Sequence, residues 1–173
     1  MHFIRRCWNA VGGWLGRAPL TDDIERRNAP FVQLVLMYFG TIMPLNLIYY
    51  WFRVDRHIGV DNAMLLNIGT DIAVITAAWV GVWLIRRGRL RGALVLFLYT
   101  LITSLALSYT YTGLRNLVID PTFPVLSLTL GGLVLGRRAL WTIFGFLLFA
   151  MSLGALSDLV REYIKPGPST YSP

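Results

Sequence analysis

Residues 120–156 read DPTFPVLSLTLGGLVLGRRALWTIFGFLLFAMSLGAL, two apolar runs separated by Gly136, Arg137 and Arg138. Asp120 and Pro121 suit a helix start, because an aspartate caps the first backbone N–H groups and proline has no N–H to leave unsatisfied. The stretch therefore predicts a hairpin of two apolar helices joined by a cationic turn. The other basic clusters of the chain can be ordered relative to that turn.

Composition places the chain in the membrane class. The 173 residues are 55% hydrophobic and only 14% charged, whereas soluble domains carry about a quarter charged residues. The net charge is +7, but the basic residues stand between apolar runs, so they indicate orientation and contact with anionic lipid headgroups rather than nucleic acid. Cys7 is the only cysteine, so no intrachain disulfide can form.

The apolar runs predict an all-α integral membrane bundle of about five transmembrane helices, because about 20 apolar residues cross the hydrocarbon core. Pro44 is expected to kink the first span, and Thr21 can cap a helix that leads toward it. The fourth run, from Thr122 to Leu135, is short, so it must borrow residues 117–119, thin the bilayer or be shielded by its neighbours. The expected spans are residues 31–52, 63–85, 93–109, 117–136 and 139–160.

The two ends of the chain differ from this bundle. Residues 1–20 place apolar side chains at helical spacing beside Arg5 and Arg6, which predicts an amphipathic helix lying in the headgroup region. A loosely bound tail and a cleaved signal peptide are the alternatives. Residues 161–173 form a Pro-rich tail for which no fold is expected.

The positions of the basic residues predict the topology. Cytoplasmic segments carry an excess of Lys and Arg, and five spans place Arg53, Arg56, Arg115, Arg161 and Lys165 outside. We therefore expect a bacterial inner-membrane protein with a cytoplasmic N-terminus and a periplasmic C-terminus. The residues expected inside are Arg5, Arg6, Arg17, Arg26, Arg27, Arg86, Arg87, Arg89, Arg91, Arg137 and Arg138.

Asp71 is the main candidate for a ligand or proton site, because a carboxylate inside a span is costly and often functional. Asn67 lies one turn earlier on the same face, and Arg115 and Asp120 fall in the next outer segment. The alternative is structural: Asp71 is hydrated near the interface or paired with Arg115 or another basic loop residue.

Small and hydroxyl residues recur every fourth position in two helices. Such stripes let helix backbones approach closely and supply interhelical hydrogen bonds. They predict packing seams inside the bundle, with a ligand-lined cavity as the alternative. Gly132 and Gly136 form a GxxxG pair that suits either an intrachain contact or a homodimer. The stripes are Gly69, Ala73, Ala77 and Gly81, and Thr100, Ser104, Ser108 and Thr112.

No motif of a catalytic site occurs in the sequence: there is no Walker A loop, GxSxG, HExxH or GxGxxG. His2 and His57 have no ligand-like neighbours at helical spacing, so no metal site is expected. His57, beside Asp55 and Arg56, suits either a pH sensor or a solvated loop residue. We expect neither an enzyme nor a cofactor.

Two stretches carry a resemblance to a known family. Residues 22–33 read DDIERRNAPFVQ, and residues 120–141 run from Asp-Pro-Thr-Phe-Pro to Gly-Arg-Arg-Ala-Leu-Trp. Over about residues 21–160 the chain resembles the N-terminal membrane regions of sensor histidine kinases from Xanthomonas-like proteobacteria. Similar regions also precede diguanylate cyclase domains. The resemblance implies a sensor region without its catalytic output.

A kinase of this kind would continue through a sixth helix to a cytoplasmic ATP-binding domain, whereas this sequence stops in the expected outer tail. We therefore expect either the input part of a longer receptor or a stand-alone membrane protein. The first hypothesis is a non-catalytic sensor with a cavity near Asp71 and Asn67. The alternatives are an accessory subunit that packs against a partner membrane protein, and a small transporter.

Overall fold

The structure, a computed structural model, describes residue 19 and residues 22–53, 62–114 and 122–164. Every regular element in these ranges is a helix. The elements in chain order are α2 (Asp23–Arg53), α3 (Asn62–Arg86), α4 (Leu90–Thr112), α5 (Thr122–Leu130), the π-helix η1 (Gly131–Leu135) and α6 (Arg137–Ile164).

Four of these helices are long and apolar enough to cross a membrane: Asp23–Leu45, Leu65–Arg86, Leu90–Tyr111 and Arg137–Tyr163. They correspond to the first, second, third and fifth expected spans and indicate a membrane-embedded protein. The fourth expected span contains a shorter apolar helix, Phe123–Leu135. The interfacial helix predicted for residues 1–20 and the tail from residue 165 lie outside the described residues.

The first helix begins earlier than the apolar pattern predicts. Oδ1 of Asp22 accepts the backbone N–H of Ile24 at 3.0 Å, a cap that satisfies one of the open N–H groups at a helix start. From there α2 runs through Pro30 and Pro44 without a break. Residues 23–30 therefore belong to the same helix as the apolar run, and Thr21 lies outside the described residues.

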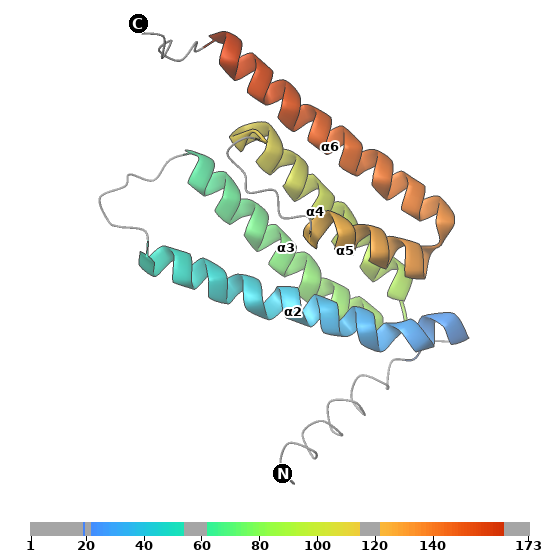
Figure 1. The fold of residues 1–173 in the computed structure, drawn as a ribbon. Coiled ribbons are helices and arrows are strands. Elements are labelled where there is room, and N and C mark those ends of the chain that lie inside the picture. The colour runs from blue at the N-terminus through green and yellow to red at the C-terminus, as the bar shows by residue number, and fades with distance from the viewer. Residues whose placement is uncertain (1–18, 20–21, 54–61, 115–121, 165–173) are drawn as a thin grey trace, which may run out of the picture.

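The short helix α5 begins partway along the bundle. The ring of Phe123, in its first turn, lies 5.8 Å from the ring of Phe39, which in turn lies 5.4 Å from Phe97. Phe39 is near the middle of α2, so α5 starts at mid-depth and runs toward the start of α6 (Figure 1). The burial of Ser127 and Leu130 shows that neighbouring helices shield this short element.

The helices pair in a simple order. Trp79 lies against Gly40, and Gly81 against Leu36, so α2 and α3 are antiparallel. Gly88 and its neighbouring arginines turn the chain from α3 into α4. Next, α4 and α6 run side by side in the same direction (Figure 1).

Two contacts fix that parallel pairing. Gly154 lies against Tyr109, and Asp158, four residues later, accepts a hydrogen bond from Leu114. Because α6 starts at the same end of the bundle as α4, the chain between them must return to that end. The end of α6 is therefore opposite to the start of α2.

We call the end where α2, α4 and α6 begin the basic end, because all eight arginines of those turns gather there: Arg26, Arg27, Arg86, Arg87, Arg89, Arg91, Arg137 and Arg138. Nε of Arg91 lies 2.7 Å from Oε1 of Glu25 and joins the starts of α4 and α2. The guanidinium of Arg87 lies 3.8 Å from the ring centre of Trp83, a cation–π contact.

Candidate functional site

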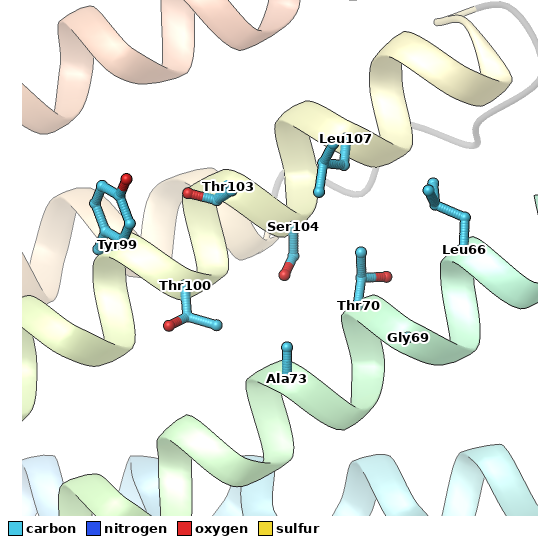
Figure 2. A pocket seen from close by; sticks show the side chains of 9 residues that line it. All are labelled: Leu66, Gly69, Thr70, Ala73, Tyr99, Thr100, Thr103, Ser104 and Leu107. Atoms are coloured by element: carbon cyan, nitrogen blue, oxygen red, sulfur yellow. The ribbon is translucent and has the colours of Figure 1, made fainter.

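A hollow of about 390 Å³ lies between α3 and α4, open on one side. Figure 2 shows its lining: Thr100 and Ser104 point from α4 toward α3, while Thr70 and Ala73 point back toward α4. The volume is at the lower end of the range of small-molecule sites. Its lining carries no charged side chain and consists of Leu66, Gly69, Thr70, Ala73, Tyr99, Thr100, Thr103, Ser104 and Leu107.

The small-residue stripe of α3 divides into two parts. A Cβ on Gly81 would lie 3.0 Å from Cδ1 of Leu36, and Ala77 is buried, so this part of the stripe packs in the bundle. Apart from its chain neighbours and its own helix backbone, Gly69 has no atom within 4 Å of such a Cβ, and with Ala73 it borders the hollow. Both alternatives that the sequence left open, a seam and a cavity lining, thus occur along one helix.

Two hydroxyl groups in the hollow differ from the other Ser and Thr hydroxyls whose side chains the structure describes. Ser and Thr hydroxyls inside apolar helices usually bond a carbonyl one turn earlier. Every other described Ser or Thr side chain makes a hydrogen bond, either of this kind or to a neighbouring helix. Within the described residues, Thr103 and Ser104 make none.

The structure places Asp71 outside the hollow. On the α3 helix its position lies midway in angle between Trp79 and Gly81, which both contact α2, so at 3.6 residues per turn its side chain faces α2. Asp71 is partly buried, and no hydrogen bond or ion pair joins it to another described residue. Asn67 has a different partner: its Oδ1 accepts the hydroxyl of Ser108 at 3.2 Å and ties α3 to α4.

A group of polar residues near the end of α6 holds the end of α4. The Ser157 hydroxyl donates to the carbonyl of Thr110 at 2.7 Å, and Asp158 accepts the N–H of Leu114 at 2.8 Å. Arg161 donates to the carbonyl of Tyr111. The last carbonyls of a helix have no partner within it, so this group, which we call the α6 clamp, supplies partners to α4 across a helix interface.

The clamp also depends on Gly113. This residue has φ +76° and lies directly against Asp158, so a side chain there would both strain the backbone and displace the carboxylate. Ser157 and Asp158 were not among the residues predicted from the sequence. Their spacing with Arg161 on one face of an apolar helix was the available signal.

The other candidate residues predicted from the sequence lie in a helix contact or a turn, or outside the described residues. A Cβ on Gly132 would lie 2.7 Å from Cδ1 of Leu140, so this glycine serves an intrachain contact with α6. Gly136, with φ +87°, forms the turn between η1 and α6. Arg115, Asp120, His2, His57 and Cys7 lie outside the described residues.

Two further observations bear on the chemistry available. Gln33 is fully buried, and its Oε1 and Nε2 have no hydrogen-bond partner among the described groups. Among the same residues, no three His, Cys, Asp or Glu side chains gather closely enough to hold a metal ion. The hollow between α3 and α4 is therefore taken as the candidate site for a small molecule.

Comparisons with known proteins find no match to this chain, whether among protein-family models, curated proteins or solved structures. The resemblance to sensor kinases stays a prediction from the sequence.

Proposed function

We propose that this protein is a non-catalytic sensor or signal-input module of the bacterial inner membrane, which takes up a lipid-soluble molecule between α3 and α4. The observation that carries the proposal is the hollow itself, where Gly69 and Ala73 leave open space beside hydroxyl groups. In this proposal the N-terminus is cytoplasmic, the C-terminus is periplasmic, and the basic end contacts anionic headgroups.

The mechanism needs two arrangements of the helices that bind the molecule unequally, because a ligand shifts an equilibrium only by its difference in affinity. An occupant of the hollow would press α3 and α4 apart. The α6 clamp grips the end of α4 through Ser157 and Asp158. A shift of α4 would therefore move α6, which serves as the output helix in this proposal.

Distance measurement by pulsed electron paramagnetic resonance between spin labels on α3 and α6 tests this mechanism. Cysteines replace Ile72 and Leu156, which are both exposed, in a Cys7→Ser background. The protein is placed in nanodiscs of synthetic phosphatidylcholine, with or without a total lipid extract of bacterial membranes. We expect the extract to produce a second inter-label distance.

Gly69→Leu fills the hollow and should abolish the second distance. Gly145→Leu is the matched control, because Gly145 also has open space around its Cβ but lies on α6, away from the hollow. It should behave as the unsubstituted protein does. An identical distance distribution in both lipid compositions, or an unchanged response in Gly69→Leu, would refute the proposed mechanism.

A second candidate is an accessory subunit of a larger membrane complex or a homodimer. It is favoured by α6, the least enclosed of the four long helices, which exposes Phe144, Phe146 and Phe149. Lipid tails can cover such a surface as well as a protein can. An obligate subunit purified alone in detergent should aggregate, whereas a sensor bundle should be monodisperse by size-exclusion chromatography with light scattering.

A further inference from the structure

We infer that the hollow between α3 and α4 binds a neutral, carbonyl-bearing molecule that dissolves in the bilayer core, with the Ser104 and Thr103 hydroxyls donating hydrogen bonds to its carbonyl oxygen. This inference rests on the proposed function and specifies the ligand class.

The hydroxyl groups determine what the ligand must offer. In hydrocarbon an unsatisfied polar group is costly, since no water is present to bond it. Thr70 and Thr100 already donate to the carbonyls of Asn67 and Leu96. Ser104 and Thr103 make no hydrogen bond with any described residue. An acceptor oxygen on the ligand would supply the partner that these two hydroxyls lack in this arrangement.

The lining excludes a charged ligand. No Asp, Glu, Lys, Arg or His is among the residues that border the hollow. A charge placed there would lack a counter-ion in a medium of low dielectric constant. The apolar walls from Leu66, Ala73 and Leu107 suit a hydrocarbon body, so the ligand is neutral and mostly apolar.

The depth of the site distinguishes this ligand from the lipids around it. Ser104 lies three residues from Leu101, the midpoint of the 23-residue helix α4, or about 5 Å along the axis at 1.5 Å per residue. The ester carbonyls of phospholipids lie at the edge of the hydrocarbon core, about 15 Å from its middle. A carbonyl that reaches Ser104 therefore belongs to a molecule dissolved within the core.

Infrared spectroscopy of a simple ketone tests the hydrogen bonds directly. The probe is heptadecanone with its carbonyl at the centre of the chain, added to nanodiscs of ether-linked phosphatidylcholine, which has no ester carbonyl band. A ketone in hydrocarbon gives one carbonyl stretch, and a hydrogen-bonded ketone gives a second at lower wavenumber. We expect the second band to grow in proportion to the protein and to be absent from protein-free nanodiscs.

The double variant Thr103→Val, Ser104→Ala should lose this band and retain radiolabelled ketone about tenfold less tightly, as expected for the loss of one to two hydrogen bonds. The matched control is Thr142→Val, Ser152→Ala. It removes the same two chemical groups from exposed positions of α6 whose hydroxyls bond their own helix. The control should keep the band at full area.

The outcomes separate this inference from the proposed function. If Gly69→Leu blocks retention of the ketone but no shifted band appears, the hollow takes up lipid-soluble molecules without these hydroxyls, and only the ligand class is wrong. Equal competition by heptadecane leads to the same conclusion. If Gly69→Leu retains the ketone as the unsubstituted protein does, the hollow is not the site and both proposals fail.

Discussion

The hairpin of α3 and α4 is closed along one half and open along the other. Near the basic end, Ile85, Leu90, Ala93 and Leu94 are completely buried. In the other half the same two helices enclose the hollow, with Gly69 and Thr103 exposed. One pair of helices with similar small residues thus gives two different interfaces.

The difference depends on a third helix. Leu36 of α2 reaches Gly81 and fills the space that the glycine leaves, and Trp79 lies against Gly40. Among the described residues, no side chain other than those of its chain neighbours comes within 4 Å of a Cβ on Gly69. A stripe of small residues therefore makes close packing available, and the neighbouring helix determines whether that packing occurs.

The two halves should face opposite sides of the membrane. A test of this topology has the largest expected effect, because a reporter enzyme is either active or inactive. Alkaline phosphatase, which is active only outside the cytoplasm, is fused after Arg91 or after Pro173. We expect no activity from the first fusion, because the basic end stays inside. Full activity is expected from the second, because α6 runs parallel to α4.

Phosphatase activity in the fusion after Arg91, or none in the fusion after Pro173, would show that the ends are assigned to the wrong sides. A fusion after Thr112, at the end of α4, serves as the internal control. It should match the fusion after Pro173, since the ends of α4 and α6 lie together.

Replacing one glycine of the α3 stripe by leucine in each half compares how closely the two halves are packed. Gly81→Leu must displace Leu36, whose Cδ1 lies 3.0 Å from the new Cβ, so we expect a loss of about 1–3 kcal/mol in the free energy of unfolding. Gly69→Leu should change it by less than about 1 kcal/mol, since the new side chain enters open space. Unfolding in mixed micelles with increasing denaturing detergent measures both, and equal losses would contradict the contrast.

The sequence predicts those parts of this fold that depend on local composition. Apolar runs locate α3, α4 and α6 within a few residues, and arginine clusters locate their turns. It does not predict that α5 starts at mid-depth, because that placement rests on Phe123 meeting Phe39 across the bundle. A helix start near Thr21 was expected from its capping and acidic residues, but its continuity with the apolar run was not, because Pro30 suggested a boundary that α2 runs through.

The candidate site was harder to predict for the same reason. Periodicity alone identified Gly69, Ala73 and Ser104 but could not separate them from Ala77 and Gly81, since the distinction lies in what α2 covers. Asp71 was a candidate because it is a charged residue within a span, yet its angular position on α3 places it on the face toward α2. Gln33, which the structure shows to be fully buried, was not among the candidate residues predicted from the sequence.

The α6 clamp holds the end of α4, in the half of the hairpin that contains the hollow. Asp158→Ala removes the acceptor of the Leu114 N–H, and the loss of a hydrogen bond to a charged group costs about 1.5–3 kcal/mol. We expect about 1–2 kcal/mol because Asp158 is only partly buried. The same unfolding assay measures it.

Asp158→Asn is the control for this change. Its side-chain carbonyl can still accept from Leu114, so about half of the lost stability should be retained. If Asp158→Asn and Asp158→Ala are equally unstable, the negative charge rather than the hydrogen bond holds the end of α4, and Arg161, one turn later on α6, becomes the residue to test.

The smallest expected effect concerns the boundary between the two halves, where the indole N–H of Trp79 donates to the carbonyl of Gly40 at 3.1 Å. Trp79→Phe keeps an aromatic ring against α2 but removes the donor, so we expect a loss of about 0.5–1.5 kcal/mol in the same assay. Trp141→Phe is the matched control: Trp141 is exposed and touches Phe144 edge-on, so the change should cost only a few tenths of a kcal/mol. A loss for Trp79→Phe no larger than for Trp141→Phe would mean that ring packing alone joins α3 to α2 at this level. The closed half would then end at Leu36 and Gly81 rather than at Gly40.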